Sequence, residues 1–371
     1  MEKPTNELRY VRSLTATNFG CLKHVQIDLG RFHAIIGPND SGKSTILRTI
    51  RTGVQLSGGC FTGGLPGLAP TAVCRPFDPG THKEAVVEIG FSDGADFRAV
   101  LREDTVEESV RAPGGDEFPS PHARKLWDPP SLIAGLDGPS QVLRGTAAPR
   151  LMRLDFDALR APSRLIPSSR PIDISDERGD GIAGVFDALM IRTIDGFLEI
   201  RESVKRFFPT VKSIGIRNVE QPGDSSAVLK VLEIELHDGT RVPADFVSQG
   251  MLYYMAFSAL RFLAPAFVLL VEEPENGFHP ARIKDVMAVL RAVSQTTQVI
   301  LTTHSPLVIN EMLPDEVSVV WRDAAGTTRA MPIAKTPNFE ERSKVYALGE
   351  LWLSYADGRD ERTLRELPDP S

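Results

Sequence analysis

One stretch of the sequence has the composition of a phosphate-binding loop. Residues 37–44 read Gly-Pro-Asn-Asp-Ser-Gly-Lys-Ser, a full match to the P-loop pattern G-x-x-x-x-G-K-[ST]. Phosphate oxygens need several N–H donors that converge on one point, and a glycine-containing loop at a helix N-terminus supplies them. Lys43 adds a positive charge near the β- and γ-phosphates, and Ser44 offers a hydroxyl to Mg²⁺. The loop is therefore predicted to bind ATP and its magnesium ion.

The loop departs from the common pattern at one position. Asp40 stands where many P-loops carry glycine. Aspartate tolerates left-handed backbone better than most side chains, so we expect the loop to close around a phosphate all the same. We assign ATP binding to nine residues: Gly37, Pro38, Asn39, Asp40, Ser41, Gly42, Lys43, Ser44 and Thr45.

Two adjacent carboxylates follow an apolar run. Residues 267–271 read Phe-Val-Leu-Leu-Val, and Glu272 and Glu273 come directly after them. Ligands of parallel α/β sheets bind at the carboxyl ends of strands, where the P-loop also lies. Mg²⁺ prefers oxygen ligands, which suits Glu272, whereas Glu273 would point differently and could polarise the attacking water. An acidic pair can also be a solvated strand end, but a P-loop in the same chain favours the metal and catalytic interpretation.

Two further motifs gain weight from their place in the chain. Residues 299–303 predict another buried strand, and His304 follows it, one helix after Glu273. A histidine at a strand end is usually structural, but on the strand beside the P-loop it can reach a γ-phosphate. Ser248-Gln249-Gly250 opens a helix whose N-terminus would bind a second phosphate, although serine is also an ordinary N-cap.

The elements that must position these groups alternate between strand and helix. Residues 8–37 predict two or three strands, the last of which leads into the loop, and 43–54 predict a helix. An irregular excursion over 56–80 precedes a predicted hairpin of strands 84–91 and 97–102. We assign no regular structure over 103–150.

The second half of the chain begins with the clearest helical pattern. One helix is predicted over 182–208, ended by Pro209, because apolar residues repeat at three and four: Ile182, Val185, Phe186, Leu189, Met190, Ile194, Phe197 and Leu198. Strands over 213–219 and 228–236 lead to a helix near Gly250. Strands and helices then alternate over 266–271, 280–294, 298–303, 306–312 and 316–322. Such alternation builds a mainly parallel sheet.

Composition restricts the class of protein. The chain has 371 residues, 42% of them apolar and 25% charged, as in ordinary soluble proteins. No secretion signal is visible, and the longest apolar run, 262–271, is too short to span a bilayer, so we expect a cytoplasmic protein without membrane contact. The three cysteines, Cys21, Cys60 and Cys74, lack metal-site spacing and are expected to be reduced thiols.

Charge argues mildly against nucleic acid as the main partner. The net charge is −7, so any DNA contact needs a local basic patch. One concentration of arginines exists, and it is either a solvated face or a phosphate-backbone contact: Arg144, Arg150, Arg153, Arg160, Arg164 and Arg170.

Together the motifs resemble the ABC-type ATPase fold of SMC, RecF and OLD-type (overcoming lysogenization defect) proteins. Residues 14–20 and 37–39 resemble the N-terminal lobe of that group, and 272–280, Glu-Glu-Pro-Glu-Asn-Gly-Phe-His-Pro, resemble its Walker B and D-loop. Residues 302–306, Thr-Thr-His-Ser-Pro, resemble its switch-histidine loop, and Ser248-Gln249-Gly250 resembles a shortened signature motif. Gly349-Glu350-Leu351-Trp352 recurs in its stand-alone members.

The resemblance implies a fold, a set of roles and a partner. We expect one ABC-type ATPase domain over 1–371, with a β lobe and P-loop in 1–55, an insertion with a hairpin and helical part in 56–245, and the remaining motifs in 246–371. The core is expected to be a mainly parallel α/β sheet flanked by helices. The family sandwiches two ATP molecules between two subunits, so Ser248, Gln249 and Gly250 would act in trans. Ser44 and Glu272 would bind Mg²⁺, and Glu273 and His304 would be catalytic.

Departures from the family narrow the functional hypotheses. SMC proteins carry a long coiled coil where this chain has a Pro- and Gly-rich insert, no Q-loop glutamine can be placed, and the 67 residues from 305 to 371 leave no room for the TOPRIM nuclease of OLD proteins. We favour a homodimeric ATPase switch for a separately encoded effector, in phage defence or DNA maintenance. The alternatives are an ATP-gated DNA clamp and a nucleotide-bound scaffold with negligible turnover.

Overall fold

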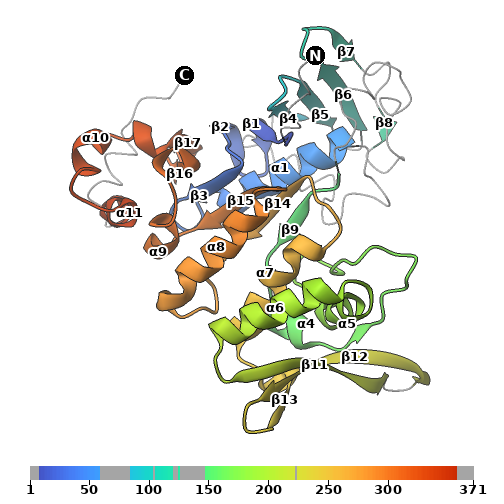
Figure 1. The fold of residues 1–371 in the computed structure, drawn as a ribbon. Coiled ribbons are helices and arrows are strands. Elements are labelled where there is room, and N and C mark those ends of the chain that lie inside the picture. The colour runs from blue at the N-terminus through green and yellow to red at the C-terminus, as the bar shows by residue number, and fades with distance from the viewer. Residues whose placement is uncertain are drawn as a thin grey trace, which may run out of the picture. The chain divides into compact units, whose positions relative to one another are not determined.

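The computed structural model describes residues 8–58, 84–102, 105–119, 124–125, 147–221 and 224–356 (Figure 1). The chain forms two compact units. The first joins residues 1–150 with 266–273 and 294–371, and the second joins 151–265 with 274–293. The boundary after Glu273 separates Glu272 and Glu273 from the D-loop segment that follows them. The segments 1–55, 56–245 and 246–371 stay a prediction about organisation.

An antiparallel sheet occupies much of the first unit. Its strand order is β2-β1-β4-β5-β6-β7, with β8 paired to β6. The strands are β1 (Val11–Phe19), β2 (Leu22–Asp28), β4 (Glu84–Phe91), β5 (Asp96–Arg102), β6 (Thr105–Arg111), β7 (Glu117–Pro119) and β8 (Arg124–Lys125). The predicted hairpin of β4 and β5 is confirmed, with Gly90 opposite Asp96.

Strands β6, β7 and β8 correct our expectation of no regular structure over 103–150. Strand β6 buries Val106, Glu108 and Val110 on one face. A glutamate at the inward-facing position hides the alternation of apolar and polar residues on which strand prediction depends. The pattern was therefore present but carried a polar residue at its centre.

The second sheet of this unit is mainly parallel, as predicted. Strand β3 (Phe32–Ile36) pairs in parallel with β15 (Gln298–Thr303) and with β16 (Val317–Arg322), and β15 pairs in parallel with β14 (Val268–Glu272). Strand β17 (Thr328–Pro332) closes the edge antiparallel to β16, and the chain leaves the unit through β9 (Arg150–Met152). Strands β3 and β15 are buried along their whole length, which explains why apolar residues follow one another in them instead of alternating with polar ones.

Helices complete the first unit. Helix α1 (Lys43–Gly58) contacts β1, β4 and β5 of the antiparallel sheet and β14 and β15 of the parallel one. Gly53 permits this packing, because a Cβ atom there would lie 2.6 Å from Cγ1 of Ile89. Later in the chain come α9 (Pro306–Ile309), α10 (Phe339–Arg342) and α11 (Leu348–Ala356), with short 3₁₀ turns η5 (Pro314–Glu316) and η6 (Ile333–Lys335).

The second unit combines helices with a long hairpin. Strands β11 (Val211–Gln221) and β12 (Asp224–Leu236) pair antiparallel, and β10 (Ser163–Arg164) and β13 (Arg241–Pro243) pair with β12. Its helical elements are α4 (Phe156–Arg160), α5 (Ile182–Arg192), α6 (Ile194–Phe207), η2 (Ala244–Phe246), α7 (Gln249–Ala259), η3 (Leu260–Phe262), η4 (Pro280–Arg282) and α8 (Ile283–Val293).

The predicted single helix over 182–208 is wrong. The chain forms two helices that meet at Thr193, whose φ of −142° and ψ of 62° are not helical. Because the break changes the helix axis, the apolar residues no longer form one buried stripe, and Met190, Ile194 and Leu198 are exposed. Gly196, just inside α6, lies against the Phe262 ring, where a Cβ atom would come within 2.7 Å.

Among the described residues, no helix is both long and apolar enough to cross a lipid bilayer.

Candidate nucleotide and catalytic site

The P-loop joins the buried end of β3 to the start of α1. Two of its residues adopt left-handed backbone, Asp40 with φ of 64° and Gly42 with φ of 106°. This confirms that Asp40 takes the conformation that glycine usually supplies. The loop therefore turns tightly and delivers its N–H groups to the N-terminus of a sixteen-residue helix.

The loop is closely packed at Gly37 and Ser41. A Cβ atom on Gly37 would lie 2.2 Å from the Val320 carbonyl oxygen and 2.7 Å from Ser41 Oγ, so only glycine fits. Ser41 is 2% exposed, and its hydroxyl has no hydrogen-bond partner in the described part of the chain. Buried hydroxyls are normally hydrogen-bonded, so this one keeps unused hydrogen-bonding capacity within the loop.

Lys43 points into the loop. Its side chain is buried, and its ammonium group donates to the carbonyl oxygens of Gly37 at 2.8 Å and Pro38 at 2.7 Å. The loop therefore combines a positive charge, a helix N-terminus and a hydroxyl that has no partner among the described residues. These residues fit the triphosphate of a nucleotide.

The β16–β17 hairpin supports the P-loop from behind. Arg322 Nε donates to the Asp40 carbonyl oxygen at 2.7 Å, and Nη1 of the same side chain donates to the Gly326 carbonyl at 3.0 Å. Thr328 Oγ1 donates to the Ser41 carbonyl oxygen at 3.0 Å. Our sequence reasoning missed both residues, because they lie more than 280 positions from the loop and form no motif.

The turn of this hairpin is itself rigid. Asp323 accepts hydrogen bonds from the N–H groups of Ala325 and Thr327 and from Arg329 Nε, which lies 3.0 Å from its carboxylate. Burial acts to raise the pKa of Asp323, but the hydrogen bonds from Thr327 and Arg329 outweigh it and lower the pKa. The carboxylate therefore stays ionised and holds the turn that carries Gly326.

Glu272 and Glu273 lie at the carboxyl end of β14, as predicted. Glu272 is in register with Thr302 of β15, and the Glu273 N–H donates to the Thr302 carbonyl oxygen at 2.9 Å. Glu273 has a φ of 47°, an unusual value for a residue with a side chain. The chain therefore changes direction at Glu273, and left-handed backbone of this kind concentrates at functional sites.

His304 lies beside Glu273. Its Nδ1 atom is 3.3 Å from Oε1 of Glu273, and the two side chains are 51% and 35% exposed. The sheet register explains the proximity: Thr303 lies opposite Ile36 of β3, and Thr302 lies opposite Glu272 of β14. The carboxyl ends of three neighbouring strands thus bring the P-loop, the acidic pair and the histidine to one edge.

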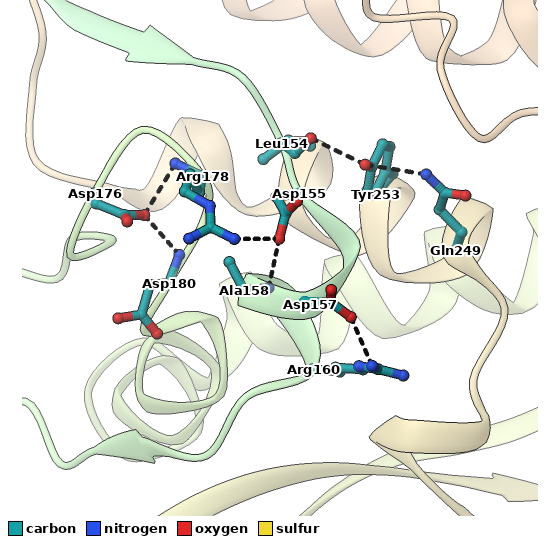
Figure 2. Close-up of polar contacts among 10 residues, drawn as sticks. All are labelled: Leu154, Asp155, Asp157, Ala158, Arg160, Asp176, Arg178, Asp180, Gln249 and Tyr253. Carbon is teal, nitrogen blue, oxygen red and sulfur yellow. Dashed lines mark hydrogen bonds and ion pairs between the residues drawn. The ribbon is translucent and has the colours of Figure 1, made fainter.

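The Ser248-Gln249-Gly250 segment lies in the second unit and opens α7 as predicted. Ser248 is the N-cap residue with extended backbone, yet its hydroxyl does not cap the helix. Gln249 Nε2 donates to Tyr253 Oη at 3.1 Å, and Tyr253 Oη donates to the Leu154 carbonyl at 2.9 Å (Figure 2). The Gln249 side chain is therefore engaged within its own unit, and Ser248 remains available to an external group.

The start of α7 packs against the D-loop. A Cβ atom on Gly250 would lie 2.8 Å from the Gly277 carbonyl oxygen, and one on Gly277 would lie 2.9 Å from Cγ of Gln249. Phe278 anchors this loop, with ring centroids 6.3 Å from Tyr253 and 6.2 Å from Phe257. The D-loop segment and the first turn of α7 are therefore in direct contact.

Asp155 fixes the neighbouring segment. It caps α4 by accepting from the Ala158 N–H at 3.0 Å and pairs with Arg178 at 2.7 Å (Figure 2). The hydrogen bond from Ala158, and then that from Arg178, lower the pKa of Asp155. The backbone that receives the Tyr253 hydroxyl is therefore itself anchored.

No group of three or more His, Cys, Asp or Glu side chains able to hold a metal ion exists within the residues described above. Mg²⁺ in nucleotide sites keeps several waters and takes only one or two protein ligands besides the phosphates. Ser44 at the start of α1 and Glu272 at the end of β14 are oxygen donors on this edge, so the donor chemistry fits a nucleotide-bound Mg²⁺.

Other candidates from the sequence contribute less. Arg160 pairs with Asp157 at 2.6 Å, whereas Arg144 lies outside the described residues. Cys60 and Cys74 also lie outside them, and Cys21 is a free thiol whose Sγ is 3.2 Å from Thr45 Oγ1.

Comparison with known proteins gives a family and a fold. The model of a family described as "AAA domain, putative AbiEii toxin, Type IV TA system" matches residues 32–310. No curated protein matches the chain. A crystal structure of an SMC head bound to the C-winged helix domain of ScpA is similar with a TM-score of 0.54 and 17% identity, over 91% of this chain and 100% of that one. The SMC head domain from Thermotoga maritima gives 0.45 and 14%, over 87% and 98%.

The first of these structures carries the fold argument. It shows the fold of an SMC head, with a mainly parallel sheet and an antiparallel lobe, as predicted from the motifs.

Proposed function

The chain belongs to the family described as "AAA domain, putative AbiEii toxin, Type IV TA system" and is an ABC-type ATPase; we propose that ATP latches two copies of it into a dimer that switches a separately encoded effector. The observation that carries this proposal is the contact between His304 and Glu273, 3.3 Å apart on the sheet edge that also carries the P-loop.

The proposal assigns each group a step in hydrolysis. The P-loop, through Lys43 and Ser41, holds the phosphates, and Ser44 and Glu272 hold the Mg²⁺. Glu273 orients the attacking water and takes its proton as the water oxygen bonds to the γ-phosphorus. The bond from that phosphorus to the bridging oxygen breaks, which leaves ADP and phosphate. His304 contacts the γ-phosphate and Glu273 together.

The dimer part of the proposal rests on the first turn of α7. Ser248 leaves its hydroxyl out of the helix cap, and Phe246 beside it is 79% exposed. A hydroxyl and free N–H groups at a helix start suit the γ-phosphate of a nucleotide held by a second copy. Closure would then follow from contacts that exist only with ATP bound, and hydrolysis would reverse it.

The effector part rests on what the chain contains. Within the described ranges we find the residues of one ATPase centre and no second catalytic constellation. The family description names a toxin and a toxin–antitoxin system, which favours a defence role. A switch whose product is a change of shape needs a partner to act on.

One experiment tests the proposal at its centre. Glu273→Gln should bind ATP, hydrolyse it about 100-fold more slowly and become dimeric with ATP by light scattering, because the base is lost but the phosphate contacts remain. Lys43→Ala should lose binding. Glu340→Gln, on exposed α10, is the matched control and should behave as wild type.

The outcomes separate the alternatives. Wild-type and Glu273→Gln proteins with equal turnover would show that Glu273 is not catalytic and would support the scaffold. A protein that stays monomeric with ATP would exclude ATP-dependent dimerisation. Material that co-purifies with ATP-bound Glu273→Gln, analysed for both protein and nucleic acid, would identify the effector or point to the DNA clamp.

A further inference from the structure

The Gly349-Glu350-Leu351-Trp352 segment forms the first turns of α11 and packs on the histidine loop. The Gly349 N–H donates to Asn310 Oδ1 at 2.7 Å. A Cβ atom on Gly349 would lie 2.2 Å from the Pro306 carbonyl oxygen, so only glycine permits this approach of α11 to α9.

Trp352 reaches the histidine itself. Its indole Nε1 donates to the His304 carbonyl oxygen at 3.3 Å, and the ring is 3% exposed. A buried tryptophan usually places its N–H on an acceptor, so the ring packing and this hydrogen bond fix each other. On the next residue, the Ser305 N–H donates to Thr303 Oγ1 at 2.9 Å. The backbone on both sides of the His304 side chain is therefore restrained.

The side chain of His304 depends on that backbone. It is half exposed, and its Nδ1 lies 3.3 Å from Oε1 of Glu273. A side chain extends from its Cα atom, so the backbone of residues 303–305, restrained by these two hydrogen bonds, sets the position and direction from which the imidazole extends toward Glu273. Small shifts of a reacting group are costly in a phosphoryl-transfer site.

We propose that Trp352 is a positioning residue for His304, and that Gly349 seats α11 so that Trp352 can act. The ATPase centre thus extends to the C-terminal helix, and a change at α11 alters the γ-phosphate contact without touching the P-loop. This inference rests on the proposed role of His304.

The test removes the hydrogen bond and keeps the ring. Trp352→Phe should lower kcat for ATP hydrolysis about tenfold, while the KM for ATP and the melting temperature stay close to those of wild type. Gly349→Ala should give a similar fall by displacing α11. Gly114→Ala is its matched control, because nothing lies within 4 Å of a Cβ atom there. Leu353→Ala, an exposed residue on the same helix, is the control for Trp352.

A double-mutant cycle distinguishes positioning from general destabilisation. On the His304→Ala background, Trp352→Phe should cost nothing further, because the group that it positions is gone. Equal losses on both backgrounds would overturn the inference, as would an unchanged kcat for Trp352→Phe alone. If His304→Ala itself left kcat unchanged, the proposed role of His304 would fall, and the positioning role with it.

Discussion

Arg322 binds the backbone of Asp40 across a sequence separation of 282 residues. Its Nε donates to the Asp40 carbonyl oxygen at 2.7 Å, and its guanidinium also lies 3.8 Å from the Asp40 carboxylate. The same side chain also donates a hydrogen bond to the Gly326 carbonyl oxygen in the turn of the β16–β17 hairpin. The left-handed residue of the P-loop is therefore held before any nucleotide arrives, which reduces the ordering cost of binding.

Arg322→Ala should weaken ATP binding relative to the wild type. One charge-assisted hydrogen bond on a partly exposed side chain is worth about 1 kcal/mol, or roughly fivefold in Kd. Arg322→Lys should recover little, because a single ammonium cannot reach both carbonyls in the geometry of the fork. Equilibrium binding of a fluorescent ATP analogue measures this. Arg111→Ala, which removes a surface arginine of β6 that faces Asp96, is the control; equal affinities for all four proteins would contradict the prediction.

The backbone of Asp40 gives a second prediction. Its φ of 64° is open to glycine and tolerable for aspartate but strained for a β-branched residue. Asp40→Gly should therefore retain nucleotide binding, whereas Asp40→Val should be about 1–2 kcal/mol less stable than Asp40→Gly and bind ATP more weakly. Urea unfolding and ATP binding, measured on both variants, check it. Equal stability of the two would mean that the loop relaxes to another backbone conformation.

The close approach of Gly250 to Gly277 gives a third prediction. Gly250→Ala would place a methyl group 2.8 Å from a backbone carbonyl oxygen, so the first turn of α7 must shift. The P-loop is unchanged, so binding of ATP should persist, but dimerisation with ATP should weaken about tenfold, or roughly 1.4 kcal/mol. Sedimentation in the Glu273→Gln background measures the dimer. Gly215→Ala is the control, because its Cβ would sit at an ordinary 3.7 Å from Glu233. If both variants dimerise alike, Gly250 has no part in the interface.

The sequence predicted the site better than the elements around it. The P-loop, the acidic pair and His304 each follow a buried strand, and parallel strands bring their carboxyl ends to one edge, so local pattern and topology agree. Arg322 and Thr328 could not be found in this way. Their contacts are with backbone atoms of a distant loop, and any residue type can supply a carbonyl oxygen.

Two failures of prediction have a common cause. The break at Thr193 and the strand β6 both depend on tertiary packing that overrides the local pattern. In β6 the inward-facing Glu108 interrupts the alternation, and at Thr193 the apolar spacing continues through a change of helix axis. Periodicity reports which residues are apolar, but the packing decides where an axis bends.

A buried histidine makes stability depend on pH. His33 lies on β3 with its Nε2 3.0 Å from Ser318 Oγ. Burial lowers its pKa from the ordinary histidine value of 6.5 to about 4, against a smaller upward effect of Glu316. Between pH 6.5 and about pH 4, His33 is therefore mostly protonated in the unfolded chain and mostly neutral in the folded chain. The stabilisation is full above the unfolded pKa and is lost as the pH falls toward the folded one.

We expect the free energy of unfolding to fall by about 2 kcal/mol from this residue alone between about pH 7.5 and about pH 5. Urea unfolding of wild type and His33→Gln at both pH values isolates the effect, because glutamine can still hydrogen bond to Ser318 but does not titrate. Other groups contribute equally to both proteins, so the wild type should lose about 2 kcal/mol more than the variant on acidification. An equal loss in both proteins would show that His33 is protonated in the folded state, and that β3 opens to admit the charge.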